Sequence, residues 1–192
     1  MQALNLPPAQ LKIVRHANRL KVFDPLRRRF VALTPEEWVR QHFVSFLQTH
    51  RSFPPEVIAN EVSLQLNGMR KRCDTIVYGP YAEPLLIIEY KAPEIEITQR
   101  TFDQISRYNM RFHVNWLIVS NGMQHFCCRI DYEHNSYRFL REIPRGDDDG
   151  ESGDTIYECL PALWLYKGER LAQPVVTEAP LGGRGEVRDL GP

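Results

Sequence analysis

Charged side chains interrupt two otherwise apolar runs in the segment RKRCDTIVYGPYAEPLLIIEYKAP, residues 70–93. Asp74 lies in the first run, and Glu89 and Lys91 lie in the second. Two carboxylates held side by side repel one another, and a neighbouring ammonium group or a divalent cation would offset that repulsion. Carboxylate oxygens suit Mg²⁺ or Mn²⁺. The residue types therefore allow a metal site, provided that the fold brings these side chains together.

A β-hairpin would bring them together. The sequence GPYAEP between the two runs contains one glycine and two prolines and cannot continue a strand ladder. With Tyr78 facing Leu85 across this turn, the antiparallel count places Asp74 directly opposite Glu89, with Cβ atoms about 4.5–5.5 Å apart. Lys91 follows two residues later on the same face. A register slip of two residues would leave the carboxylates diagonal but still on one face.

An exposed cluster of ion pairs on a surface hairpin is the simpler interpretation of the same residues, and such a cluster contributes little to stability. The run LLIIEYKAP is, however, too continuously apolar for a strand with one face in water. It predicts a central strand. Ionised residues at the end of a central strand need a compensating interaction, which favours a functional site.

Helices and further strands are predicted on both sides of the hairpin. TPEEWVRQHFVSFLQTH predicts an amphipathic helix with Thr34 as its N-cap and Glu37 completing a capping box. NEVSLQLNG alternates and predicts a half-buried strand. TQRTFDQISRYNMRF predicts a second helix capped by Thr98 and packed through Phe102 and Ile105. HVNWLIVSNGMQHFCCRID predicts a hairpin around its Asn-Gly pair, and SYRFLREI a last strand.

This order of elements indicates the fold class α/β (α+β mixed sheet). Residues 1–33 form a basic N-terminal segment, in which a short hairpin is predicted with its turn near Asp24. Seven Lys and Arg residues against one acid favour a polyanionic partner, and a solvated basic segment explains them equally well. Residues 146–192, which begin with GDDDGESGD, predict an acidic linker and a partly disordered tail.

The hairpin motif resembles a known nuclease signature. Asp74, followed on the next strand by Glu89, Tyr90 and Lys91, is similar to the D…(E)XK motif of the PD-(D/E)XK nuclease superfamily, with Cys73 in place of the nominal proline. The longer run KRCD…LIIEYKAP…FDQISRYN…WLIVSNGMQHF resembles the N-terminal nuclease domain of type I restriction enzyme R subunits, especially small stand-alone relatives. The resemblance implies a restriction-endonuclease-like αβββαβ core with flanking helices.

The same resemblance implies a nuclease-like domain over residues 34–145 and roles for matching side chains. Asp74 and Glu89 would bind Mg²⁺ (or Mn²⁺). Lys91 would orient the attacking water or help to deprotonate it. Gln104 and Tyr108 match a Q-x-x-x-Y pattern of such relatives, and their i, i+4 spacing places them on one helix face, where they would support the site or contact DNA.

A further acid from the first helix often completes sites of this kind. Glu37 is the better candidate because it turns partly inward beside Trp38, although the capping box explains it without any chemistry. Glu61, on the polar face of the following strand, is the alternative. The basic residues 70–72 would contact phosphates or form a solvated strand end.

The function implied is a metal-dependent nuclease, endonuclease or exonuclease, that hydrolyses phosphodiester bonds in DNA for restriction or repair. No G-x-x-x-x-G-K-[ST] motif occurs, so a motor or specificity subunit would be a protein partner. The alternative is a catalytically silent nucleic-acid-binding or scaffolding module of a multi-protein defence complex, which the zero net charge favours. A third interpretation is a subunit that is active only when assembled.

The sequence also bears on the cellular location and the oligomeric state of the protein. No apolar run is long enough to cross a membrane, and no signal peptide is recognisable, which predicts a soluble cytoplasmic protein. Oligomeric state does not follow from the sequence, because there is no uninterrupted heptad pattern.

Overall fold

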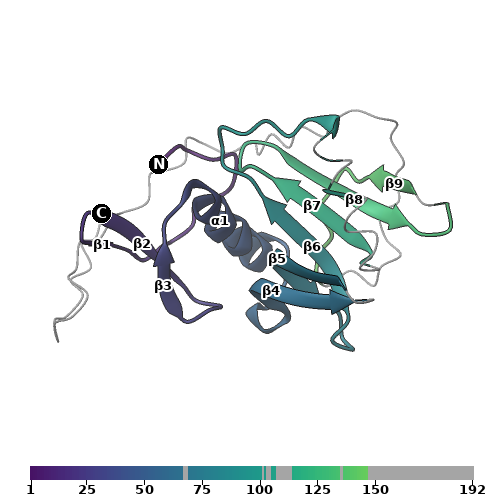
Figure 1. Cartoon of the computed structure of the whole chain (residues 1–192), viewed down its shortest axis with the longest axis horizontal. Coiled ribbons are helices and arrows are strands. Elements are labelled where there is room, and N and C mark those ends of the chain that lie inside the picture. Colours follow the sequence, from purple (N-terminus) through teal and green to yellow (C-terminus); the bar gives the residue numbers. More distant parts are fainter. Residues whose placement is uncertain (67–68, 101, 103–104, 107–113, 135, 147–192) are drawn as a thin grey trace.

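Two β-sheets and one long helix make up most of the part of the chain that the structure describes (Figure 1). The computed structural model describes residues 1–66, 69–100, 102, 105–106, 114–134 and 136–146. The smaller sheet is antiparallel, in the order β1 (Ile13–His16), β2 (Arg19–Asp24), β3 (Arg29–Ala32). The larger sheet runs β4 (Ile58–Leu66), β5 (Met69–Tyr78), β6 (Pro84–Tyr90), β7 (Trp116–Ser120), β8 (His125–Asp131), β9 (Ser136–Phe139). Only β6 and β7 pair in parallel among these strands.

Helix α1 (Pro35–His50) begins and ends close to where the sequence predicts. The Thr34 hydroxyl accepts a hydrogen bond from the Glu37 N–H at 3.1 Å, so the N-cap is confirmed. The reciprocal half of the capping box is not formed, because the Thr34 N–H donates to the Ala32 carbonyl at 3.1 Å. This leaves the Glu37 carboxylate available for other partners.

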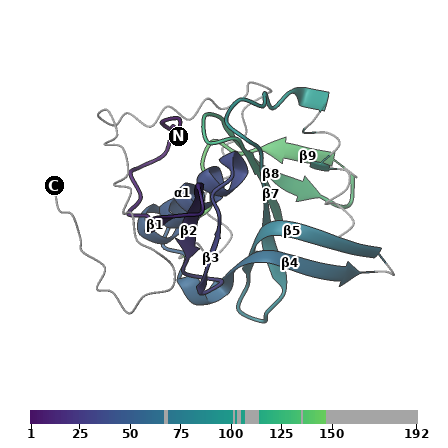
Figure 2. The ribbon, with the colours of Figure 1, turned by 60° about the vertical axis from the view of Figure 1, so that its left-hand side comes forward.

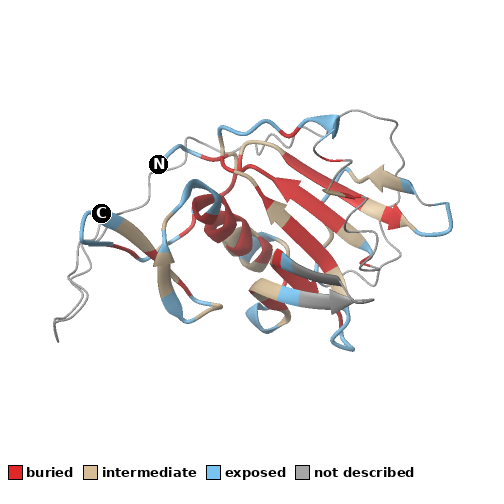
Figure 3. Ribbon diagram, viewed as in Figure 1, coloured by how far each residue is buried: buried red, intermediate tan, exposed pale blue. Residues whose placement is uncertain are grey.

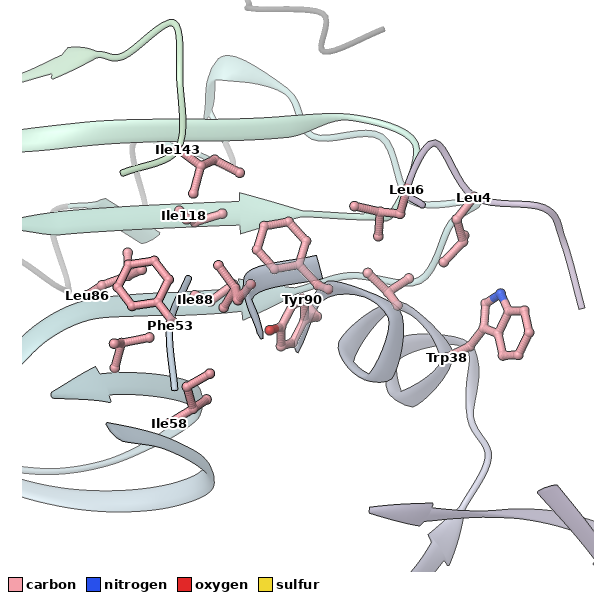
Figure 4. Packing of buried hydrophobic residues seen from close by; sticks show 14 of the residues in the cluster. Leu4, Leu6, Trp38, Phe53, Ile58, Leu86, Ile88, Tyr90, Ile118 and Ile143 are labelled. Atoms are coloured by element: carbon pink, nitrogen blue, oxygen red, sulfur yellow. The ribbon is translucent and has the colours of Figure 1, made fainter. Parts of the chain in front are cut away.

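The helix packs between the two sheets (Figure 1). Its buried residues Val39 and Phe43 belong to one apolar cluster with Val22 of the smaller sheet and Leu86 and Ile118 of the larger one. Figure 4 shows part of this cluster, and Figure 3 shows that the buried residues follow α1 and the centre of the larger sheet. Burying each such side chain contributes about 1.5–3 kcal/mol, so this layer fixes α1 firmly against both sheets.

A second apolar cluster covers the opposite face of the larger sheet. Phe102 is buried there, with its ring centroid 4.7 Å from that of Phe139. Residues 99–100, 102 and 105–106 are helical, and the Phe102 N–H donates to the Thr98 carbonyl at 2.9 Å. The predicted second helix is therefore confirmed at the residues that are described. A short 3₁₀ helix, η1 (Pro55–Val57), leads into β4.

The order of elements agrees with the predicted one. α1, the β4–β6 meander, the second helical stretch and β7–β9 follow one another, and β6 lies between β5 and β7 as a central strand. The Asn-Gly hairpin is also confirmed, with Gly122 at φ 81°. The predicted acidic linker and tail lie outside the described residues, apart from Gly146, whose N–H donates to the Arg51 carbonyl at 2.7 Å. Among the described residues, no helix is long and apolar enough to span a membrane.

The N-terminal segment contains more structure than the one predicted hairpin. Its predicted turn after Asp24 joins β2 to β3, but a second turn at Ala17 and Asn18 adds β1. Both turn residues have positive φ, 45° and 62°. Alanine seldom adopts this conformation, so the sequence carries little signal for that turn.

Candidate active site

The register between β5 and β6 agrees with the predicted hairpin count, except next to the turn. Thr75 pairs with Ile88, and Val77 pairs with Leu86, as the sequence count requires. Asp74 and Glu89 are the next residues beyond the last pair, Thr75 with Ile88. The end near the turn differs, because a bulge makes Tyr78 pair with Pro84 instead of Leu85.

The two strands part at this point. The backbone pairing between β5 and β6 ends at Thr75, whereas β5 continues beside β4 as far as Met69. Figure 2 shows β4 and β5 leaving the rest of the sheet as a two-stranded ribbon. The Tyr90 N–H, which would otherwise lack a ladder partner, donates to Asp74 Oδ2 at 2.9 Å. The Asp74 carboxylate therefore lies in the fork between two diverging strands.

A third acid lies at the same level on β4. Asn60 pairs with Thr75 and Val62 pairs with Cys73, so Glu61 is opposite Asp74. Glu61 has φ 59°, a left-handed conformation that costs on the order of 1–3 kcal/mol for a non-glycine residue and interrupts the alternation of the strand. Three adjacent strands thus each carry an acid near the point where β5 and β6 part, and these three residues are called the acid row below: Glu61, Asp74 and Glu89.

Arg40 of α1 extends to this row. Its Nη1 lies 2.8 Å from Glu61 Oε1 and its Nη2 lies 3.1 Å from Asp74 Oδ1. Nη1 also lies 2.7 Å from Glu37 Oε2, one helical turn away. The residue is 4% exposed, and among the described residues none offers its buried Nε a hydrogen-bond acceptor. Such an unsatisfied donor costs about 1–3 kcal/mol, so the guanidinium is held mainly through its two terminal nitrogens.

Glu37 is buried, as its predicted inward orientation requires, and it is 6% exposed. Its Oε1 accepts hydrogen bonds from Arg27 Nη2 at 2.5 Å and from Gln41 Nε2 at 2.8 Å. Its Oε2 faces Arg40. The Glu37 carboxylate therefore holds the two arginines, and its predicted participation in a metal site stays a prediction.

Asp24 ties the smaller sheet to this network. It accepts hydrogen bonds from the Arg27 N–H at 3.0 Å and from Asn60 Nδ2 at 2.9 Å, and it pairs with the Arg27 side chain. Burial by itself raises the pKa of Asp24, but these hydrogen bonds and the guanidinium charge lower it below its ordinary value. A continuous chain of ion pairs and hydrogen bonds thus runs from the β2–β3 turn through α1 to Asp74.

Neither arginine was identified from the sequence. Arg27 belonged to the basic segment, whose charges predict contacts with solvent or a polyanion, yet it is largely buried beside Asp24 and Glu37. Arg40 follows Glu37 at i, i+3, a spacing that allows an ion pair on a helix surface, and this was the available signal. Its second and third partners come from strands and depend on the tertiary fold.

Lys91 follows β6 directly and is half-buried, and its N–H donates to the Ser120 carbonyl at 2.9 Å. No described residue forms an ion pair with its ammonium group. Gln104 and Tyr108 lie outside the described residues. Of the basic residues 70–72, Arg72 has a side chain that is 70% exposed and pairs with Glu61.

The donor chemistry of the acid row fits Mg²⁺ or Mn²⁺. No three His, Cys, Asp or Glu side chains within the described ranges are grouped as ready metal ligands. Mg²⁺ nevertheless keeps several waters and commonly takes only one or two protein carboxylates. Among the described residues, this ion-paired network holds one more carboxylate than guanidinium groups, and a cation would offset the remaining negative charge. The carboxylates are Asp24, Glu37, Glu61 and Asp74, and the guanidinium groups are Arg27, Arg40 and Arg72.

Comparison with known proteins places this sequence in a family. The sequence profile described as "Type I restriction enzyme R protein N terminus" matches residues 35–144, more than half of the chain. The chain belongs to this family. Both α1 and the whole acid row fall inside the matched region, whereas β1–β3 precede it.

A solved structure is also similar. It is a fragment described as an HsdR subunit of a type I restriction enzyme from Vibrio vulnificus YJ016, with 18% sequence identity and a TM-score of 0.41. The match covers 59% of this chain and 24% of that chain, so only about a quarter of the solved fragment is matched. No curated protein sequence matches the chain.

Proposed function

We propose that this protein is a metal-dependent nuclease that hydrolyses phosphodiester bonds in DNA, of restriction or repair type. The observation that supports this most is the register of β5 and β6, whose last pair is Thr75 with Ile88, so that Asp74 and Glu89 are the next residues where the strands part, with Lys91 immediately after β6. Membership of the family of type I restriction enzyme R protein N termini supports a restriction-type role.

Each side chain of the proposed site has a separate role in hydrolysis. Asp74 and Glu89 would hold Mg²⁺ or Mn²⁺, which polarises a phosphate and lowers the pKa of a bound water when present. Lys91 supplies an ammonium group that orients the attacking water and stabilises negative charge on the phosphate oxygens. Attack forms one P–O bond to the water oxygen and breaks the ester P–O bond, and the leaving oxygen takes up a proton. Gln104 and Tyr108 are proposed to support the site or to contact DNA.

Plasmid nicking tests this proposal. Wild type should convert supercoiled DNA to open circles with Mg²⁺ and lose that activity in EDTA. Asp74→Asn, Glu89→Gln and Lys91→Met should each abolish nicking while retaining a cooperative unfolding transition. Asp131→Asn is the matched control, since that acid is on β8 and pairs with His134. Nicking by Lys91→Met at the wild-type rate would contradict the assigned role of Lys91.

A second candidate function is a catalytically silent nucleic-acid-binding or scaffolding module. The observation that favours it is the ion pair between Arg40 and Asp74, which uses the carboxylate oxygen that a cation would need. This alternative predicts DNA binding that is independent of Mg²⁺ and no nicking by wild type. A subunit that needs a motor or specificity partner would instead show nicking only after those subunits are added.

A further inference from the structure

We propose that Arg40 is the resident counter-ion of the acid row, and that a divalent cation binds there by displacing the Arg40 guanidinium from Asp74. The inference rests on the proposed function, because it concerns cation binding by the same carboxylates. It assigns Arg40 a positioning and regulatory role, in which the side chain holds the acids together without a cation and yields one contact when a cation arrives.

The three contacts of Arg40 differ in length and in exposure to water. These differences indicate that the contact with Asp74 is the one that a cation would break. Its Nη1 lies 2.7 Å from Glu37 and 2.8 Å from Glu61, whereas its Nη2 lies 3.1 Å from Asp74. The Asp74 side chain is 27% exposed, compared with 7% for Glu37 and 15% for Glu61. An arriving cation therefore meets Asp74 first, at the longest of the three contacts.

Both oxygens of Asp74 already have partners. Oδ2 accepts the Tyr90 N–H at 2.9 Å, so it is fixed by the backbone of β6. Oδ1 faces Arg40. A carboxylate oxygen has room for two partners, but a guanidinium and a divalent cation on one oxygen would be like charges only a few Å apart. Binding at Oδ1 thus requires Arg40 to withdraw.

Arg40 can move away from Asp74 and still keep its contacts with Glu37 and Glu61. Glu37 and Glu61 retain its Nη1, and Glu37 is itself fixed by Arg27 at 2.5 Å on its other oxygen. Because no described residue accepts a hydrogen bond from Nε, a rotation of the guanidinium about Nη1 breaks no further bond there. The guanidinium can therefore turn about Nη1, which stays bound to Glu37 and Glu61, while the contact of Nη2 with Asp74 is broken.

Calorimetric titration of Ca²⁺ and Mn²⁺ into wild type and Arg40→Gln tests the proposal without using activity. The variant should bind either cation about tenfold more tightly, since a competing charge has been removed. Arg28→Gln is the control, because it removes the same charge from an exposed position in the turn between β2 and β3. Its affinity should stay near that of wild type. Equal affinities of wild type and Arg40→Gln would overturn the inference and leave the proposed function standing.

Thermal unfolding provides a second measurement on the same samples. Arg40→Gln should melt at a lower temperature than wild type in EDTA, and added Ca²⁺ should recover most of that loss. Wild type should respond much less, because its resident guanidinium already offsets the repulsion. A variant whose melting temperature falls equally with and without Ca²⁺ would mean that Arg40 is purely structural, and would overturn the inference.

If Arg40→Gln does not fold, the wild-type protein decides the question. The Nε–Hε resonance of Arg40, assigned by its loss in Arg40→Lys, should shift during a Ca²⁺ titration, while that of Arg27 stays in place. An unmoved Arg40 resonance, together with binding heat that Asp74→Asn removes, would overturn the inference alone. Absence of cation binding in both wild type and Arg40→Gln would overturn the metal dependence as well.

Discussion

Arg27, in the turn after β2, and Glu37, in the first turn of α1, form an ion pair with an Nη2–Oε1 distance of 2.5 Å. Their side chains are 12% and 7% exposed, so the pair is largely shielded from water. It joins a sheet that precedes the family match to the helix that carries Arg40. The N-terminal sheet is therefore part of the physical support of the acid row.

The first prediction concerns this support. Arg27→Gln should lower the free energy of unfolding by about 3 kcal/mol, because it leaves buried Asp24 and Glu37 without their shared cation. Urea unfolding measures the loss. Arg28→Gln, at an exposed neighbouring position, should change stability by less than about 0.5 kcal/mol. Equal effects of the two substitutions would show that the buried pair contributes no more than a surface charge.

The N-cap of α1 gives a second prediction. Thr34→Ala should reduce stability by about 1 kcal/mol, because the Glu37 N–H loses its acceptor. Thr34→Ser keeps the hydroxyl and should stay close to wild type in the same urea experiment. Because the reciprocal Glu37 contact is absent, a loss far above 2 kcal/mol for Thr34→Ala would indicate that the cap also orients the buried carboxylate.

The third prediction separates the two acids considered for completing the metal site. Glu37 has both oxygens engaged by buried partners, whereas Glu61 Oε2 pairs with a largely exposed arginine. Glu61→Gln should therefore weaken Mn²⁺ binding more than Glu37→Gln does, measured by calorimetry. Glu37→Gln should instead cause the larger loss in urea unfolding. The opposite ranking in both measurements would return Glu37 to the role of metal ligand.

The sequence predicted the strands that carry these residues well. Apolar continuity identified β6 as central, and the hairpin count gave the pairs Thr75–Ile88 and Val77–Leu86, although the bulge at Tyr78 was not foreseen. The left-handed conformation of Glu61 and the arginine network could not be predicted in this way. Both arise where α1, β4 and the N-terminal turn meet, and such contacts between distant segments leave no periodic signal in the sequence.

The last prediction concerns acid sensitivity and starts from His125, which is 3% exposed on β8. Its Nε2 donates to the Asn5 carbonyl at 2.9 Å, and its Nδ1 accepts from the Ser120 hydroxyl at 2.8 Å, which fixes a neutral ring. Burial lowers the pKa of His125 to about 4 from 6.5, and the bond to Asn5 opposes this only in part. The unfolded chain therefore binds the proton more readily than the folded protein does.

The stabilising effect of a neutral His125 is thus complete above its unfolded pKa of 6.5 and declines as the pH falls toward 4. Between pH 7.5 and pH 5 we expect a loss of about 2 kcal/mol in the free energy of unfolding from this group. Buried His42, whose pKa burial also lowers, adds a loss of the same sign. Urea unfolding at both pH values should show a shallower pH dependence in His125→Gln than in wild type. His134→Gln, whose side chain is 75% exposed, should keep the wild-type dependence, and a wild-type dependence in both variants would place the acid sensitivity elsewhere.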